Sequence, residues 1–188
     1  MKHRFKNTCY DAKKLLTDCN KLSTFMNRLV AQSDTDPDMW EPETYRGDGF
    51  EAFVECLIAA SPIDKRINIV DYRPWDARTD GVDMGIDGVG VSGDTGRNHA
   101  VQIKFRSNTQ QNLTANYDHI SNFVAKSETY FGADRDMTIF TTAKDLLKPI
   151  NEGMYGNRVR TLGYRELAKL VDTNRPFWDY FRRQMGVK

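Results

Sequence analysis

Apolar residues recur every three or four positions between residues 11 and 31, which is the spacing of one face of an α-helix. This pattern predicts one long amphipathic helix over 11–31. The stretch 32–49, rich in Asp, Pro and Gly, interrupts the pattern and predicts a linker. A second, more apolar helix is predicted over 50–60, where Ser61-Pro62 ends it.

The pattern then changes to short β-rich runs separated by turn residues. Three strands are predicted over 67–72, 86–91 and 99–105. The turn-rich segment 92–98 joins the last two, so we expect them to form a β-hairpin. The rest of the chain alternates between helices, predicted at 113–131, 143–152 and 164–171, and strands, predicted at 137–142 and 159–162.

This order of elements, α, linker, α-β-β-β-α-β-α-β-α, predicts an α/β fold. We expect a central mixed β-sheet flanked by helices and preceded by an extra N-terminal helix. The 188 residues suit one domain, or one domain with a helical appendage. We expect the N-terminal helix and linker to occupy residues 1–46 and the α/β domain to occupy residues 47–188.

Composition narrows the function classes. The 27 Lys and Arg residues are balanced by 26 Asp and Glu residues, a formal net charge of +1, so any surface for a polyanion must be local. The cysteines, Cys9, Cys19 and Cys56, lack the spacing of a disulfide framework or a zinc cluster. No apolar run is long enough to span a membrane, so we expect a soluble, intracellular protein. His99 and His119 are expected to be structural or surface residues.

The segment that carries candidate chemistry is the predicted hairpin. Gln102 and Lys104 alternate with apolar residues, so a strand would hold both side chains on one face. Asp87, near the start of the first hairpin strand, can lie beside them if the hairpin pairs as expected. Glu51, on the preceding helix, can point into the same cleft, whereas Glu55 is expected on the solvated side of that helix. These groups together can form a site for a hard divalent cation with an activated water.

Three short motifs carry a resemblance to a known group. Gly49-Phe50-Glu51 opens a predicted helix, Gly85-Ile86-Asp87 opens a strand, and Gln102-Ile103-Lys104 lies on the next strand. In this order and spacing they resemble the restriction-endonuclease-like, or PD-(D/E)XK, nucleases. Among these they are similar to the Mrr-type branch, in which glutamine replaces the second acidic residue.

The second half of the chain extends the resemblance. Segments 139–143, 159–162 and 164–167 are similar to the second half of such domains, including those attached to phage and bacterial helicases. The resemblance covers about residues 48–181 and implies a restriction-endonuclease-like core of αβββαβ order. It also implies a metal-dependent DNA endonuclease that hydrolyses phosphodiester bonds, with Mg²⁺ as cofactor and Mn²⁺ as a substitute.

The resemblance implies a role for each site residue, with Glu51, Asp87, Gln102 and Lys104 as the catalytic set. Asp87 would bind the metal directly, together with the Gln102 amide oxygen and the backbone carbonyl of Ile103. Glu51 would act through a metal-bound water or a second ion. Lys104 would stabilise charge or orient the attacking water. Because glutamine brings no charge, we expect weaker metal affinity than a second carboxylate would give.

The implied partner is DNA. Basic residues around the hairpin and in the C-terminal third are candidates for phosphate contacts, and we select Arg97, Arg106, Lys144 and Arg160. The resemblance is also compatible with a homodimer for double-strand cutting and with association with a helicase. It implies a location in the cytoplasm of a bacterial or phage-infected cell.

Other interpretations remain open at this point. The same fold can serve as a catalytically inactive nucleic-acid-binding module. Gln102 and Lys104 can be the solvated face of an edge strand, and Asp87 an ordinary turn residue. Residues 88–93 fit the G-x-G-x-x-G pattern of nucleotide-binding loops, but a turn and a strand follow them instead of a helix. Asp94-Thr95-Gly96 matches the aspartic-protease triplet, yet its flanking residues are polar where that family has apolar strands.

Overall fold

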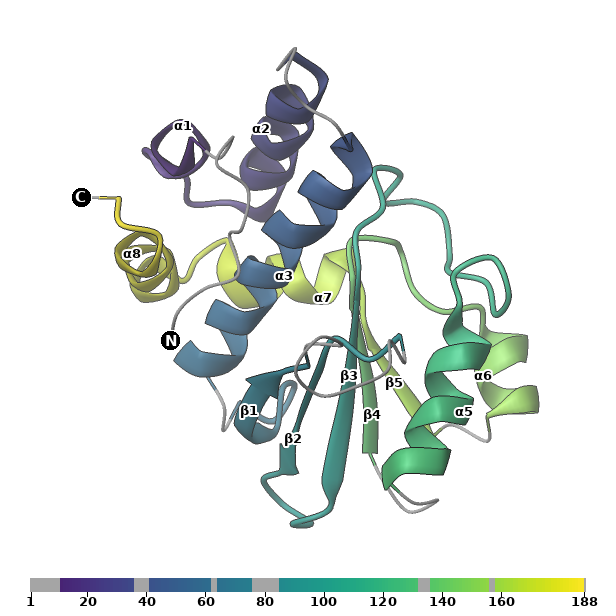
Figure 1. Ribbon diagram of the computed structural model, residues 1–188. Coiled ribbons are helices and arrows are strands. Elements are labelled where there is room, and N and C mark those ends of the chain that lie inside the picture. Colours follow the sequence, from purple (N-terminus) through teal and green to yellow (C-terminus); the bar gives the residue numbers. More distant parts are fainter. Residues whose placement is uncertain are drawn as a thin grey trace. The chain divides into compact units, whose positions relative to one another are not determined.

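The structure is a computed structural model that describes residues 11–35, 41–61, 64–75, 85–131, 136–155 and 158–187 (Figure 1). The chain divides into two compact units. A helical unit comprises Met1–Ala60 and Arg165–Lys188, and a sheet unit comprises Ser61–Tyr164. Among the described helices, none combines the length and the apolar character needed to cross a membrane.

The sheet unit contains a five-stranded mixed sheet in the order β1-β2-β3-β4-β5. Its strands are β1 (Ile69–Pro74), β2 (Gly88–Ser92), β3 (Asn98–Lys104), β4 (Asp136–Thr141) and β5 (Val159–Leu162). The first three strands pair antiparallel, whereas β3, β4 and β5 pair parallel. The predicted hairpin is confirmed, because β2 and β3 pair with Gly88 opposite Val101. This arrangement makes β3 the central strand.

One face of the sheet is covered by α5 (Ile120–Phe131) and α6 (Lys148–Met154), as Figure 1 shows. Between helices and strands lies an apolar core that includes Ile86, Ala100, Ile120, Phe123, Met137, Ile139, Leu146 and Val159. Ala100 of β3 belongs to this core, and alternate residues of a strand share a face. Gln102 and Lys104 therefore project toward the side of the sheet that α5 covers. The predicted α/β fold with a mixed sheet flanked by helices is confirmed.

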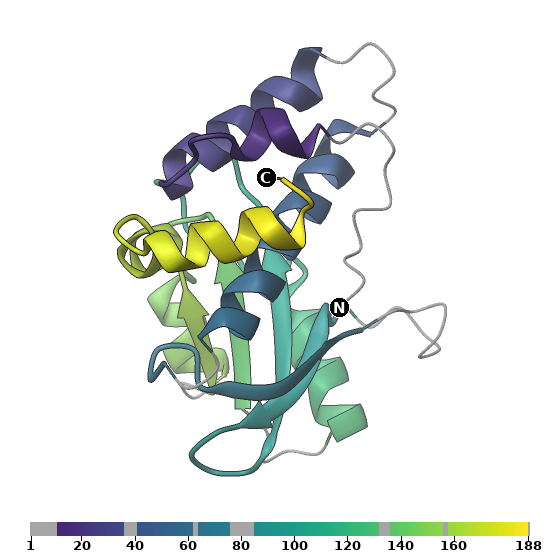
Figure 2. The same ribbon diagram turned by 90° about the vertical axis from the view of Figure 1, so that its left-hand side faces the viewer.

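The described helices of the helical unit are α1 (Ala12–Leu16), α2 (Leu22–Thr35), α3 (Pro42–Ala60), α7 (Tyr164–Val171), which enters the unit at Arg165, and α8 (Arg175–Gln184). Aromatic rings from three helices form its core. Phe53 of α3 packs against Phe25 of α2 and Phe177 of α8, with ring centroids 5.6 and 5.2 Å apart. Figure 2 shows α8, in yellow, crossing α3. The buried Trp178 indole N–H donates to the Val171 carbonyl at 2.8 Å, so this core holds no unsatisfied indole.

The prediction of one helix over 11–31 is wrong, because the chain breaks between α1 and α2. Asp18 adopts a left-handed backbone conformation with φ of 53°, which ends the helical path. The carbonyls exposed at the break accept hydrogen bonds from arginines distant in sequence. Arg28 donates to the Leu15 carbonyl at 3.1 Å, and Arg182 donates to the Cys19 carbonyl at 2.7 Å. Apolar periodicity cannot reveal these tertiary caps.

The predicted linker 32–49 is also too long, since α3 begins at Pro42 instead of residue 50. Proline suits the first turn of a helix, where its missing N–H is not needed. Contacts with α2 stabilise the early turns: Tyr45 is buried and its hydroxyl donates to Gln32 Oε1 at 2.5 Å. Farther along α3, Glu55 is only 2% exposed, so its predicted place on a solvated face is wrong.

Two further helix predictions needed correction, and one helix was missed. The first helix after β3 begins at Ile120, because Leu113 instead forms an isolated bridge with Leu146. The helix after β4 begins at Lys148 for the same reason. Helix α8 was not predicted, although Asn174 caps it by accepting a hydrogen bond from the Phe177 N–H. An Asn-Arg-Pro sequence is a typical helix start, so this signal was available in the sequence.

The described cysteines are free thiols. Cys19 and Cys56 are both buried, and Cys9 lies outside the described residues. Burial, together with the neighbouring Glu55, raises the pKa of Cys56 to about 12. A protonated thiol is neither a nucleophile nor a metal ligand at neutral pH, so Cys56 serves packing.

Candidate active site

The β2-β3 hairpin fixes Asp87 near the carboxyl end of β3. Continuing the register in which Gly88 pairs with Val101 places Asp87 opposite Gln102. The Asp87 N–H donates to the Val101 carbonyl at 2.9 Å, and one carboxylate oxygen, Oδ2, accepts from the Ile103 N–H at 2.6 Å. The carboxylate therefore takes a ladder position beside the central strand. Asp87 is held there by both its backbone and its side chain.

Gln102 is completely buried, and only one end of its amide is satisfied. Its Nε2 donates to the Gly85 carbonyl at 2.9 Å, while Oε1 is buried without a hydrogen-bond partner. The orientation of the amide is unambiguous, because a carbonyl such as that of Gly85 can only accept. A buried acceptor without a partner costs about 1–3 kcal/mol. The interpretation of Gln102 as the solvated face of an edge strand is therefore wrong.

Lys104 is the last residue of β3 and shares the face of Gln102. Its side chain is partly exposed, in contrast to that of Gln102. Its carbonyl accepts from the Thr141 hydroxyl at 2.8 Å and from the Thr142 N–H at 3.2 Å. The structure thus brings together three predicted site residues, Asp87, Gln102 and Lys104, on one hairpin.

Glu51 belongs to the helical unit. It lies on α3 and is partly exposed. Because Glu51 and Asp87 belong to different units, the contribution of Glu51 to the site stays a prediction.

The donor set on the hairpin suits a hard cation. Among the described residues there is no group of three or more His, Cys, Asp or Glu side chains that could hold a metal. The donors that the sequence predicts here are all oxygens: the Asp87 carboxylate, the Gln102 amide and the Ile103 carbonyl. Oxygen donors are what Mg²⁺ prefers, and the unpartnered Oε1 of Gln102 is an acceptor that a cation would satisfy.

The glycines that follow Asp87 have a structural reason. A Cβ atom at Gly88 would lie 2.3 Å from ring atoms of Tyr72, and one at Gly90 would lie 2.8 Å from Ile69 Cγ2. The Tyr72 ring therefore fills the space beside Gly88, and the Ile69 side chain and the Val70 carbonyl oxygen fill the space beside Gly90. This packing accounts for the G-x-G pattern without a bound nucleotide, and β2 leads into a turn and then β3.

A second polar cluster lies at the amino end of β3, around the buried His99. His99 Nδ1 lies 2.9 Å from Ser92 Oγ, and Nε2 lies 2.8 Å from Thr138 Oγ1. The Ser92 hydroxyl donates to Asp136, so it must accept from the Nδ1–H of a neutral His99. Burial lowers the pKa of His99 to about 4. The structural role predicted for His99 is confirmed, and His119 is exposed as predicted.

This cluster does not have the connectivity of a hydrolase triad. In a triad the carboxylate bonds the histidine and the histidine activates an accessible serine. Here the carboxylate of Asp136 bonds the serine, and Ser92 is 1% exposed. The cluster holds β2, β3 and β4 together.

The four predicted DNA contacts are spread over the sheet unit. Arg97 is exposed in the β2-β3 turn at its amino end, and Lys144 is exposed beyond the carboxyl end of β4. The guanidinium of Arg106 bonds Asp118 at 2.9 and 2.5 Å and the Phe105 carbonyl at 2.7 Å. Arg160 is half-buried and donates to the Lys65 carbonyl at 3.3 Å, and its pKa is lowered by burial. Their contact with DNA stays a prediction.

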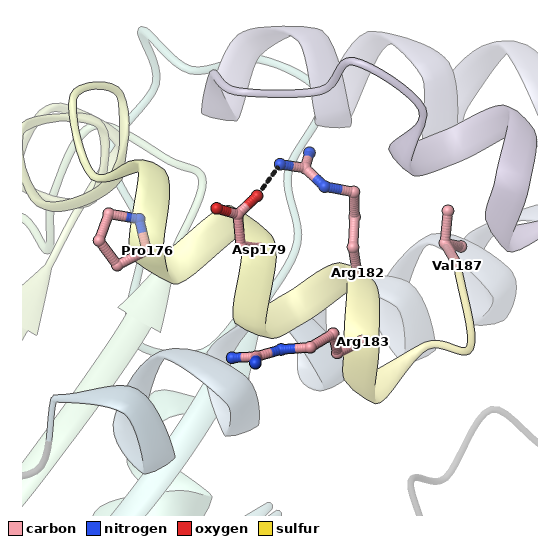
Figure 3. Close-up of a pocket in the computed structure, with 5 residues that line it drawn as sticks. All are labelled: Pro176, Asp179, Arg182, Arg183 and Val187. Atoms are coloured by element: carbon pink, nitrogen blue, oxygen red, sulfur yellow. Dashed lines mark hydrogen bonds and ion pairs between the residues drawn. The ribbon is translucent and has the colours of Figure 1, made fainter.

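A groove on α8 in the helical unit contains none of the predicted site residues. Figure 3 shows its lining residues, Pro176, Asp179, Arg182, Arg183 and Val187. The Arg182 guanidinium bonds Asp179 at 2.7 Å as well as the Cys19 carbonyl, so it serves helix packing.

An α/β sheet unit whose central hairpin carries Asp87, Gln102 and Lys104 is typical of a restriction-endonuclease-like nuclease. A family model described as restriction endonuclease, of the Mrr type, matches residues 63–181, more than half of the chain. The chain therefore belongs to this restriction endonuclease family, and the predicted resemblance is confirmed. The match includes all three hairpin residues and begins after Glu51. A search of curated proteins returned no match.

Proposed function

We propose that this protein is a metal-dependent DNA endonuclease that hydrolyses phosphodiester bonds. The observation that carries the proposal is the buried, unpartnered Oε1 of Gln102, a residue whose backbone lies opposite that of Asp87 in the hairpin. Membership of the restriction endonuclease family supports nuclease activity in general. The buried oxygen supports the more specific inference that a cation completes the site, with Mg²⁺ as the natural ion and Mn²⁺ as a substitute.

The bound cation would supply an activated water and would offset negative charge on the phosphate. Asp87, the Gln102 amide oxygen and the Ile103 carbonyl would hold it, and Asp87 alone among them brings a formal charge. Lys104, on the same strand face as Gln102, stabilises charge on the phosphate or orients the water. Glu51 would contribute through a metal-bound water or a second ion. A single charged ligand favours millimolar rather than tight Mg²⁺ binding.

The proposed substrate is DNA, approached by exposed basic residues such as Lys144 and Arg97. Cutting both strands requires two sites, which a homodimer supplies. Association with a helicase and a place in the cytoplasm of a bacterial or phage-infected cell fit the same proposal. We assign the activity to a domain spanning residues 47–188.

The test is cleavage of supercoiled, linear and branched DNA in Mg²⁺, Mn²⁺ or EDTA. We expect cutting only with metal, and a loss of at least about 10²-fold in Asp87→Asn and Lys104→Ala. Asp94→Asn is the matched control, because Asp94 is an exposed carboxylate in the turn of the same hairpin. It should cut like the wild type.

A second readout separates metal binding from catalysis. Mn²⁺ should raise the melting temperature of the wild type and of Lys104→Ala, but not of Asp87→Asn. If the wild type binds DNA but cuts no substrate in any metal, the protein is a non-catalytic nucleic-acid-binding module of the same fold. Cutting that survives in EDTA would contradict the metal proposal itself.

A further inference from the structure

We propose that Thr141 and Thr142 are positioning residues for Lys104, a role that rests on the proposed function of that lysine. Thr141 is the last residue of β4 and pairs with Lys104, the last residue of β3, and Thr142 follows it directly. Both are fully buried. Their hydroxyls bond backbone groups of Lys104, Ala143 and Arg106, so their effect would pass through the backbone at and just beyond the end of β3.

The first contact fixes the carbonyl of Lys104. The Thr141 hydroxyl donates to it at 2.8 Å, and the Thr142 N–H donates to it at 3.2 Å. The Ala143 N–H in turn donates to the Thr141 hydroxyl at 3.0 Å. Two donors on one carbonyl hold the peptide plane from which the lysine side chain extends.

The second contact fixes the residue where the chain leaves the sheet. The Thr142 hydroxyl accepts from the Arg106 N–H at 2.6 Å and donates to the Arg106 carbonyl at 2.8 Å. One hydroxyl therefore holds both polar backbone groups of Arg106. Serine can form the same pair of bonds, whereas valine has the shape of threonine but can form neither.

The side chain of Arg106 holds the chain beyond β3 from the other side, where it meets the loop that contains Asp118. It bonds Asp118, which is 3% exposed and also accepts from the Thr114 N–H at 2.5 Å. The chain from Lys104 to Arg106 is thus held on the β4 side by Thr141 and Thr142 and on the loop side by Asp118.

This arrangement compensates for the position of Lys104 at a strand end. Strand ends open locally more readily than strand centres. A lysine whose backbone shifts by about 1 Å would misplace its ammonium group and lose catalytic rate without losing DNA affinity. We call the contacts of Thr141, Thr142 and Asp118 with the chain from Lys104 to Arg106 the clamp. Weakening the clamp should therefore lower kcat specifically.

The experiment compares Thr142→Val with Thr142→Ser and with Thr138→Val in the full chain. Thr138 is the matched control, because it is an equally buried threonine of β4 whose hydroxyl bonds His99 at the opposite end of β3. We expect Thr142→Val to lower kcat on DNA at least about 10-fold with KM within about 2-fold, and Thr142→Ser to restore it. Thr138→Val should lower the melting temperature comparably yet leave kcat within about 2-fold of the wild type.

Equal kcat losses in Thr142→Val and Thr138→Val, or no loss in either, would overturn the inference. If Thr142→Val does not fold, Asp118→Asn replaces it and should reproduce the selective loss in kcat. If the wild type cuts no DNA, the proposed function fails, and amide hydrogen exchange then tests the clamp alone. Exchange at Arg106 that is no faster in Thr142→Val than in Thr138→Val would overturn it.

Discussion

The two ends of β3 hold two buried polar clusters that differ in one respect. At the amino end, both ring nitrogens of His99 have partners, and the carboxylate of Asp136 accepts from Ser92 and Thr95. At the carboxyl end, Gln102 is equally buried, but its Oε1 has no partner. One cluster is saturated within the protein, and the other has an acceptor left over.

This difference separates a structural cluster from a candidate binding site. Saturated hydrogen bonds inside a protein hold strands in register and leave nothing for a ligand to add. An unpartnered buried oxygen costs stability in the isolated protein, and a ligand that coordinates it removes that cost. We therefore expect substitutions at the amino end to change stability, and substitutions at the carboxyl end to change activity.

The largest effect should come from Gln102→Leu, which removes the unpartnered oxygen at nearly constant volume. We expect roughly 10³-fold slower metal-dependent cleavage, because a ligand and an aligned dipole are lost. The free energy of unfolding should change by less than about 1 kcal/mol, since the lost bond to Gly85 is offset by removal of an unsatisfied group. Cleavage assays and urea unfolding measure the two quantities. If Gln102→Leu is strongly destabilised but still active, Gln102 serves stability instead of activity and the expected difference between the two ends of β3 is wrong.

Acid should lower the stability of the protein through His99, at the amino end of β3. The pKa of His99 is about 4 in the folded chain against 6.5 for an ordinary histidine, because burial disfavours the charged ring. Asp136 and Asp94 favour the charged ring, and Arg160 opposes it. Between these two values the unfolded chain binds the proton first, so stability falls as the pH drops from about 6.5 to 4 and levels off below.

The total loss from this group should be about 3 kcal/mol. Unfolding measured by urea across this pH range checks it. His99→Gln should flatten the slope, and His119→Gln should not, because His119 is exposed. An identical slope in the wild type and in His99→Gln would assign the acid sensitivity to other groups.

Thr138→Val should cost stability alone. It leaves Nε2 of the buried His99 without a donor, and we expect a loss of about 2 kcal/mol in the free energy of unfolding. Thermal or urea unfolding measures this loss beside the cleavage rate. A fall in the cleavage rate that exceeds the loss of folded protein would show that the two ends are coupled.

The smallest effects concern DNA affinity. Lys144 lies at the carboxyl end of the sheet, and Arg97 lies at the other end of β3. If DNA binds over the cluster at the carboxyl end of β3, Lys144→Ala should weaken binding a few-fold. It should also lower the number of ions released on binding, read from the salt dependence, by about one. Arg97→Ala should then have the weaker effect, as measured by fluorescence anisotropy at several salt concentrations. A larger effect of Arg97→Ala would indicate that DNA binds near the β2-β3 turn instead.

The sheet and the pairing of the hairpin strands were predictable because their signals are local. Alternating residues placed Gln102 and Lys104 on one face, and the turn between the strands brought Asp87 beside them. The break between α1 and α2 was not predictable from periodicity, since Arg28 and Arg182 stabilise it from other parts of the chain.

Burial was the other quantity that the sequence could not provide. Glu55 has the spacing of a solvated position but is buried, because the surroundings of a helix decide which polar residues it covers. The unpartnered Oε1 of Gln102 likewise depends on which atoms reach it in three dimensions. The sequence indicated which residues are candidates for the proposed site, and packing revealed that the Oε1 atom of Gln102 is buried without a partner.

The close approach of Tyr72 to Gly88 has a consequence for engineering this site. An alanine at position 88 would overlap the tyrosine ring, so selections that vary one codon at a time should recover glycine at that position. A library that varies positions 72 and 88 together can instead combine a smaller side chain at position 72 with a larger one at position 88. Because Gly88 follows Asp87 directly, a library that aims to redirect the Asp87 carboxylate should vary Tyr72 and Gly88 together.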